Sequence, residues 1–112
     1  MPHAELKYSS DLKIDAENIL TLIEARINEH DPKAGACKGR AYPAAVFHRS
    51  HILVEISMVT KPHRDEAFTL ALRDALEIAI KGCLTQRCYF SLGIRYSDVV
   101  YITTEFLPDN LT

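Results

Sequence analysis

The sequence predicts an α+β fold in which a β-α-β unit occurs twice. Two helices then lie on one face of a four-stranded mixed sheet, and a further strand follows at the C-terminus. Three observations support this prediction. Short segments alternate between apolar and polar residues, as half-buried strands do, and two longer segments have apolar residues at helical spacing. These segments follow one another in the same order in each half of the chain. With 112 residues, the chain is expected to form a single domain over residues 1–112.

The first half of the chain contains one predicted helix between two predicted strands. Residues 2–8 form the first strand. Asp15 can cap a helix that runs to about Glu29, and residues 31–39 form a loop punctuated by proline and glycine. A second strand is expected over residues 38–48. The apolar stripe of the helix consists of Ile19, Leu20, Leu22, Ile23 and Ile27.

The second half repeats this order. Apolar residues alternate strictly along a third strand over residues 51–59, and a second helix is expected from residue 65 to about residue 84, with acidic residues on its first turn. Strands near residues 89–96 and 99–106 come next, followed by a tail over residues 107–112. The stripe of the second helix consists of Phe68, Leu72, Ala75, Leu76, Ala79, Ile80 and Cys83.

The predicted arrangement leaves one face of the sheet uncovered. If that face is apolar, it must be covered by something, and self-association is the simplest solution. We therefore expect a homo-oligomer, in which the strand over residues 99–106 pairs with the sheet edge of a neighbouring subunit.

Composition and charge exclude several classes of function. A hydrophobic content of 47% and a charged content of 25% are those of an ordinary soluble protein, and a net charge of −2 does not favour nucleic-acid binding. No apolar run reaches the ~18 residues of a membrane span, and no signal-peptide pattern is present, so we expect no membrane association and a cytoplasmic location. The three cysteines, Cys37, Cys83 and Cys88, lack zinc-site spacing and are expected to be reduced thiols.

Pro2 is the candidate catalytic residue, because its nitrogen becomes a free secondary amine if Met1 is removed. An ordinary α-amine has a pKa of ~7.7–8.0, and burial or nearby cations lower that pKa further. Such an amine can act as a base near neutral pH. If Met1 is retained, the same nitrogen belongs to an amide and is not basic, so the predicted role depends on this one cleavage.

Four short motifs resemble those of one known family. They are Met1-Pro2-His3 at the start of the first strand, Tyr8-Ser9 at its end, Gly39-Arg40 on the second strand, and Arg64 at the start of the second helix. Their order and spacing, over nearly the whole chain, resemble the tautomerase superfamily, in particular its 5-carboxymethyl-2-hydroxymuconate delta-isomerase-like branch. The resemblance implies a tautomerase-like fold, a homotrimer with active sites at subunit junctions, and no metal or organic cofactor.

The resemblance also implies roles for individual residues. Pro2 is the expected general base, and Arg40 and Arg64 are the expected cations that bind the substrate and polarise it. Arginine suits this role because its guanidinium pairs bidentately with a carboxylate and stays charged. Taken alone, either arginine has an alternative interpretation as an ordinary surface or helix-start residue. The candidate substrate-binding residues are His3, Tyr8, Tyr101 and Phe106, although the aromatic ones are also typical of sheet core or interface.

Two segments depart from the family pattern. The connection between His48 and His51 is shorter than the family's loop, and Lys61-Pro62-His63 stands where a glycine-rich turn is usual. Both changes affect which substrate would fit. His48 and His51 flank a turn without a third ligand, so we expect a surface pair and no metal site.

The predicted function is isomerisation: movement of a proton within a small unsaturated 2-hydroxy or keto acid. A dicarboxylate such as 5-carboxymethyl-2-hydroxymuconate, as found in aromatic catabolism, is the expected substrate. One alternative keeps Pro2 as a cationic acid for hydration, dehalogenation or decarboxylation, with Glu5, Glu55 or Glu105 activating water. A second alternative is a non-catalytic oligomeric binding protein that keeps the fold.

Overall fold

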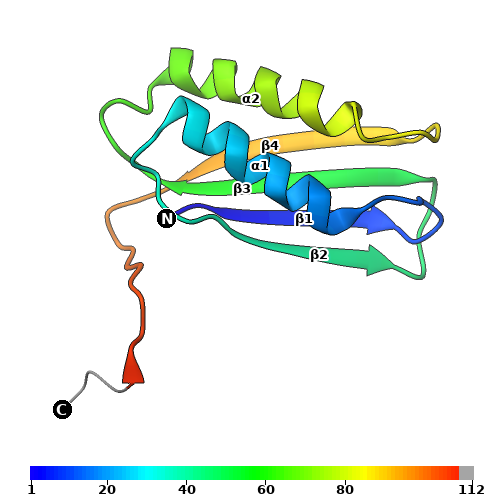
Figure 1. Ribbon diagram of the computed structural model, residues 1–112, viewed down its shortest axis with the longest axis horizontal. Helices are drawn as coiled ribbons and strands as arrows, with labels where there is room; N and C mark the ends of the chain where they lie inside the picture. Colours follow the sequence, from blue (N-terminus) through cyan, green and yellow to red (C-terminus); the bar gives the residue numbers. More distant parts are fainter. Residues whose placement is uncertain (109–112) are drawn as a thin grey trace.

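The structure is a computed structural model that describes residues 1–108. It contains four strands and two helices in the predicted order (Figure 1). The elements are β1 (His3–Ser9), α1 (Ala16–His30), β2 (Lys38–Ala44), β3 (His51–Val59), α2 (Glu66–Lys81) and β4 (Tyr89–Ser97).

The sheet has the strand order β2-β1-β3-β4. β1 pairs parallel with β2, β3 pairs parallel with β4, and the two central strands, β1 and β3, pair antiparallel. Each half of the chain is thus a β-α-β unit with parallel strands. The two units join through the antiparallel pairing of β1 with β3. The predicted duplication and the mixed four-stranded sheet are confirmed.

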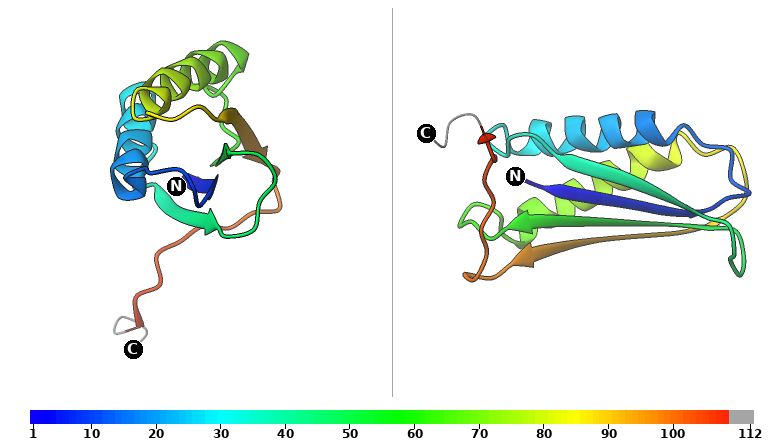
Figure 2. Two further views of the ribbon diagram at one scale, coloured as in Figure 1. Left: turned by 90° about the vertical axis from the view of Figure 1, so that its right-hand side faces the viewer. Right: turned by 90° about the horizontal axis from the view of Figure 1, so that it is seen from below.

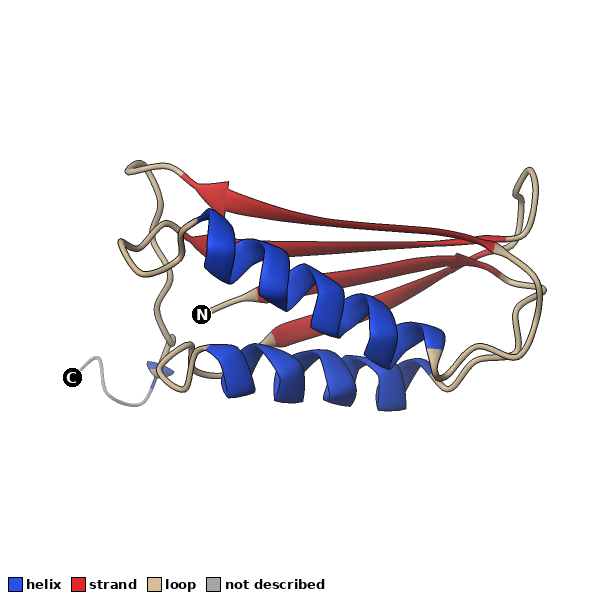
Figure 3. Ribbon diagram, turned by 90° about the horizontal axis from the view of Figure 1, so that it is seen from above, coloured by secondary structure: helices blue, strands red, loops and turns tan. Residues whose placement is uncertain are grey.

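Both helices begin at aspartate caps and cover one face of the sheet (Figure 3). Asp15 Oδ1 accepts a hydrogen bond from Asn18 N at 3.1 Å, and Asp65 Oδ1 accepts one from Phe68 N at 2.9 Å. Such caps satisfy amide groups that have no partner within the helix. The α-helical part of α2 ends at Lys81, and i→i+3 hydrogen bonds continue the turn to Leu84, the predicted end.

The core lies between the helices and the sheet. Every third or fourth residue of each helix is buried against alternate residues of the central strands, as the predicted spacing requires. The most deeply buried of these residues are Ile19, Ile23 and Ile27 of α1, Leu72, Leu76 and Ile80 of α2, and Ala4, Leu6, Ile52, Val54, Ile56 and Met58 of the sheet.

The uncovered sheet face is largely polar, so the condition stated above for covering it is not met: the outward positions of the strands carry many charged side chains. Lys7 Nζ lies 3.1 Å from Glu55 Oε1, and Arg40 Nη2 lies 3.0 Å from Glu5 Oε1. Arg40 also contacts His3 Nδ1 at 3.1 Å. β1 alternates apolar and polar residues, so only its helix-facing side is apolar. A partly exposed, ion-paired face is compatible with water and needs no cover.

The predicted C-terminal strand over residues 99–106 is absent from the described chain. After β4 ends at Ser97, the backbone leaves the body of the molecule in an extended path (Figures 1 and 2). A strand needs a neighbour to satisfy its amide and carbonyl groups, and within residues 1–108 this segment has none. Val99, Val100 and Ile102 are at least 85% exposed. Of the predicted tail, residues 109–112 lie outside the described residues.

β2 is also shorter than predicted, ending at Ala44 instead of residue 48. The reason lies in its partner: β1 ends at Ser9, and the last contact between the two strands is the hydrogen bond from Ser10 N to Ala44 O. Beyond Ala44 the chain has no strand to pair with, and it turns toward β3.

Candidate active site

The chain begins at an edge of the sheet where several segments meet. β1 and β2 start at this edge, and the antiparallel β3 ends there, as does β4 (Figure 1). The C-terminal end of α1 and the loop from β3 to α2 close the same edge. Residues far apart in the sequence therefore come together around Pro2.

Pro2 is buried, with less than 2% of its surface exposed. Its carbonyl accepts a hydrogen bond from Lys38 N at 2.9 Å, which continues the β1–β2 pairing up to the first residues of the chain. Burial lowers the pKa of the N-terminal amine of Met1 below its ordinary value of 8.0, and the charges of Lys38, Lys61 and Arg64 lower this pKa further. The start of the chain thus lies in a partly desolvated, cationic environment.

Lys38 is the cation in direct contact with the first residue. Its Nζ donates to Met1 O at 3.3 Å and to Thr103 Oγ1 at 3.4 Å, so it also joins the C-terminal segment to this edge. Lys38 is not among the site residues predicted from the sequence. The feature that could have identified it is the parallel pairing of β1 and β2, which places the first residue of β2 beside the first residues of β1.

Arg64 lies at this edge, but its guanidinium is occupied. Arg64 Nε and Nη2 donate to Asp31 Oδ2 at 3.0 and 2.8 Å, and Nη1 donates to Val59 O at 2.6 Å. The side chains of Arg64 and Asp31 are 1% and 5% exposed. In the described chain the Arg64 guanidinium is therefore buried and paired, and its charge lowers the pKa of the N-terminal amine. The direct contact with substrate that the resemblance implies stays a prediction.

Asp31, predicted from the sequence only as the first residue of a loop, holds this cluster together. Burial alone would raise the pKa of its carboxyl group. The hydrogen bonds from His63 and Arg64, together with the charge of Arg64, outweigh burial and bring that pKa to about 2. His63 Nε2 lies 2.9 Å from Asp31 Oδ2. The Asp31 carboxylate is thus ionised near neutral pH, and both of its oxygens already have hydrogen-bond partners within the chain.

The structure does not bring Arg40 to Pro2. Arg40 pairs with Glu5 on the open face of the sheet, and the cations that lower the pKa of the N-terminal amine are Lys38, Lys61 and Arg64 instead. His3 contacts Arg40 and lies on the same open face. Its side chain points away from the helices because successive side chains of a strand alternate between the two faces of the sheet. Burial, Lys38 and Arg40 lower the pKa of His3, which favours its neutral form.

The aromatic candidates are not assembled around Pro2 within one chain. Tyr8 packs against the core near the far end of β1, roughly 20 Å along the strand from Pro2. Tyr101 and Phe106 belong to the exposed C-terminal segment and are 44% and 72% exposed. Thr103, between them in sequence, contacts Lys38, so this segment passes the candidate site.

Within residues 1–108, no three His, Cys, Asp or Glu residues are grouped so that they could hold a metal ion. Of the carboxylates proposed for the water-activating alternative, Glu5 and Glu55 are ion-paired on the open face, and Glu105 belongs to the C-terminal segment that passes Lys38. Cys37, Cys83 and Cys88 are free thiols. Burial and the charge of Glu24 raise the pKa of the Cys37 thiol to about 11, which keeps it protonated.

Comparison with solved structures identifies the fold. A 5-carboxymethyl-2-hydroxymuconate delta-isomerase matches with a TM-score of 0.77 at 17% sequence identity, over 95% of this chain and 89% of that one. A 5-carboxymethyl-2-hydroxymuconate isomerase from Deinococcus radiodurans R1 matches with a TM-score of 0.71 at 15% identity, over 93% and 88% of the two chains. A macrophage migration inhibitory factor-like protein from Entamoeba histolytica matches with a TM-score of 0.61 at 12% identity, over 86% and 88%.

The predicted resemblance is thus confirmed at the level of the fold, which is the small α+β fold of these three proteins. No family model matches the sequence, and no curated protein matches it either. In the part of the chain that the structure describes, no helix is long and apolar enough to cross a membrane.

Proposed function

We propose that the chain, once Met1 is removed, is an isomerase that uses Pro2 to move a proton within a small unsaturated keto or 2-hydroxy acid. The observation that supports this most directly is the environment of Pro2. A secondary amine at this buried position would lie beside Lys38 and near Lys61 and Arg64. Burial and these charges both favour the neutral amine, which is the basic form. The shared fold of the isomerases above agrees with this assignment.

The proposed reaction needs no group beyond the chain and its substrate. The neutral Pro2 nitrogen removes a proton from the carbon next to a carbonyl group, and the electrons of the broken C–H bond move onto the carbonyl oxygen. The protonated amine then returns the proton to another carbon of the conjugated system, the electrons move back, and the amine is neutral again. Positive charge near the oxygen stabilises the intermediate enolate.

Lys38 is the side chain that we assign to the anionic part of the substrate. Its amine is only partly buried, and removal of Met1 takes away one of its two acceptors, Met1 O at 3.3 Å. The other acceptor is the neutral Thr103 Oγ1 at 3.4 Å, and a carboxylate would be a stronger acceptor than this hydroxyl. Lys61 is exposed in the β3–α2 loop and adds a second positive charge at the same edge. Two cations suit a dicarboxylate such as 5-carboxymethyl-2-hydroxymuconate.

We also propose that the active protein is a homotrimer. The C-terminal segment passes Lys38 and carries exposed apolar residues that find no cover within their own chain, among them Val99, Val100, Ile102 and Phe106. A neighbouring subunit can cover them and can bring Tyr101, Phe106 or Arg40 to a shared site. In the described chain Arg40 pairs with Glu5 on the open face, and Tyr101 and Phe106 are 44% and 72% exposed.

The water-activating alternative has less support. Hydration or dehalogenation needs a carboxylate that can activate water beside the base. Asp31 is a buried carboxylate at this edge, and its Oδ2 already accepts hydrogen bonds from Arg64 and lies against His63. An acid held in this way, with a pKa of about 2, is a poor base.

The test is an assay of the chain that starts at Pro2, with 2-hydroxymuconate and phenylenolpyruvate as substrates in D2O. Intact mass confirms that Met1 is absent. We expect ketonisation of at least one of the two acids, with deuterium incorporated at the carbon that receives the proton. A fully trimmed and folded chain that neither ketonises these acids nor exchanges their protons would overturn the proposal.

Replacing Lys38 by glutamine is expected to raise KM about tenfold or more, because one charge-assisted hydrogen bond to the substrate is lost. The same change removes a cation that lowers the pKa of the terminal amine, so that pKa rises. The acidic limb of the kcat/KM profile should therefore shift to higher pH. Lys13→Gln is the matched control, since Lys13 is exposed at the opposite end of the sheet, where its amide contacts Gln86. A Lys38 variant with an unchanged KM and pH profile would contradict the assignment.

A further inference from the structure

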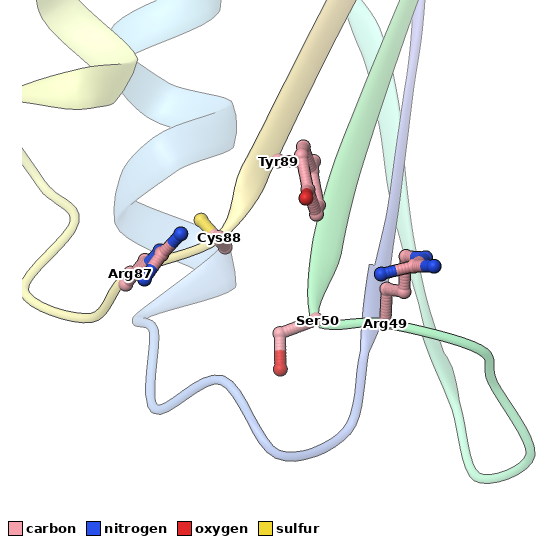
Figure 4. Close-up of a pocket in the computed structure, with 5 residues that line it drawn as sticks. All are labelled: Arg49, Ser50, Arg87, Cys88 and Tyr89. Carbon is pink, nitrogen blue, oxygen red and sulfur yellow. The ribbon is translucent and has the colours of Figure 1, made fainter.

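A second site, independent of the proposed function, lies at the opposite edge of the sheet. There the turn before β3 meets the loop before β4, around a hollow of about 240 Å³ (Figure 4). Tyr89 N donates to Ser50 O at 3.0 Å and holds the two segments together. β3 is nine residues long, so this edge is roughly 30 Å from the one around Pro2. The hollow is lined by Arg49, Ser50, Arg87, Cys88 and Tyr89.

Two arginines give the hollow its chemical character. The side chains of Arg87 and Arg49 lie on either side of Ser50 and Tyr89 in Figure 4. Both residues are exposed, and within residues 1–108 neither guanidinium is paired with a carboxylate, whereas Arg26 and Arg73 are. A guanidinium presents a rigid fork of donors that matches two oxygens of one anion. Two such forks at one hollow suit a ligand with two negative charges.

The backbone at Arg49 is held in an unusual conformation. Its φ angle of 66° lies in the left-handed region, which residues other than glycine, asparagine and aspartate rarely adopt. The Arg49 carbonyl contacts His51 Nδ1 at 2.7 Å, which fixes the turn on one side. A strained residue that carries a charged side chain into a hollow is typical of binding sites.

The remaining groups limit what can bind. The Ser50 hydroxyl donates to Asp11 Oδ2, so it is already used and places one carboxylate beside the hollow. The two arginines outweigh this single negative charge. The volume is below the ~300–1,000 Å³ of sites for drug-sized ligands, which restricts the ligand to a small molecule. We propose that this hollow binds a small dianion, either a phosphate-bearing molecule or a dicarboxylate, between Arg49 and Arg87.

The test is a titration of the folded full chain at low ionic strength, with inorganic phosphate in one series and succinate in the other, followed by backbone amide shifts in NMR spectra. We expect saturable shifts at residues 49–51 and 87–89 with at least one of the two anions. Arg49→Gln and Arg87→Gln should each weaken the Kd about tenfold, and the double variant should abolish saturation. Asp11→Asn should tighten binding, because it removes the opposing charge.

Arg95→Gln is the matched control, because it removes one exposed arginine charge from the other end of β4, and should leave the Kd unchanged. Arg49→Lys and Arg87→Lys are used if either glutamine variant is poorly folded. They keep the positive charge but lose the two-pronged guanidinium, so a weaker Kd in these variants shows that its geometry contributes to binding. Saturation with phosphate alone, or with succinate alone, supports the site and identifies the ligand class. Shifts that never saturate, that are confined to the Pro2 edge, or that both arginine substitutions leave unchanged would overturn the proposal.

Discussion

A chain that retains Met1 is expected to lose the proposed isomerase activity, with kcat/KM lower by about 10²–10⁴-fold than in the chain that starts at Pro2. With Met1 attached, the Pro2 nitrogen is an amide, and its lone pair is delocalised into the carbonyl group. The free amine then belongs to Met1, one residue farther from the buried position of Pro2. The two chains differ by a single residue outside the core, so we expect the same fold. The one polar contact that changes is the hydrogen bond from Lys38 Nζ to Met1 O, which the trimmed chain lacks.

The measurement compares kcat/KM of the two chains on the better of the two enol acids, with intact mass defining each sample and circular dichroism confirming equal folding. Pro2→Ala in the trimmed chain provides an intermediate case. It keeps a terminal amine at the same place but loses the ring that fixes φ, so its activity should lie between those of the two other chains. Equal activity with and without Met1 would exclude Pro2 as the base and would favour a different reactive group.

The fold could be predicted from the sequence because the local patterns agree with one another. Strict alternation over residues 51–59 and the helical spacing of Ile19, Ile23 and Ile27 correspond to the buried faces of β3 and α1. Asp15 begins α1 as expected. The strand predicted over residues 99–106 failed because an apolar extended segment becomes a strand only when it has a neighbour. Residues outside the segment 99–106 determine whether a neighbouring strand is present.

The candidate site was predicted less well than the fold, because its members meet through strand register and loop packing. Pro2 was identified by its position in the chain. Lys38 required knowledge that β1 and β2 are parallel and start together. Asp31 required the approach of the β3–α2 loop to the end of α1, 33 residues apart in sequence. Arg40 pairs with Glu5 on the outward face of its own chain, so its predicted role depends on a neighbouring subunit, about which the sequence pattern says nothing.

Breaking the buried pair of Asp31 and Arg64 is expected to have the largest effect on stability. Asp31→Asn should lower the free energy of unfolding by about 3–5 kcal/mol, because it leaves the buried Arg64 guanidinium without a counter-charge. That is a large part of the roughly 5–15 kcal/mol that stabilises a domain of ordinary size. Chemical denaturation at neutral pH measures the change. Glu77→Gln is the control: the exposed Lys81–Glu77 pair has good geometry at 2.6 Å, yet should contribute only about 0.5 kcal/mol or less.

The pair also predicts how stability depends on pH. The folded-state pKa of Asp31 is about 2, below the ordinary value of 3.8, so the unfolded chain binds a proton at this group more readily than the folded chain does. The stabilisation is fully present above pH 4 and is lost as the pH falls from there toward 2. The difference in stability between the wild type and Asp31→Asn should therefore shrink over this range. A difference that stays constant from pH 4 to pH 2 would contradict the assignment of the low pKa to Asp31.

The same variants separate the two roles that Arg64 can have. If Arg64 is a structural cation, the double variant Asp31→Leu/Arg64→Met should recover most of the stability lost in Asp31→Asn, because no charge is left buried. In that double variant KM should change little, while the pKa of the terminal amine should rise, since Arg64 is one of the cations that lower it. If Arg64 binds the substrate, as the family resemblance implies, KM should rise sharply in a folded double variant. An increase in KM of a hundredfold or so would then assign Arg64 to the substrate, with Asp31 holding it in place until the substrate arrives.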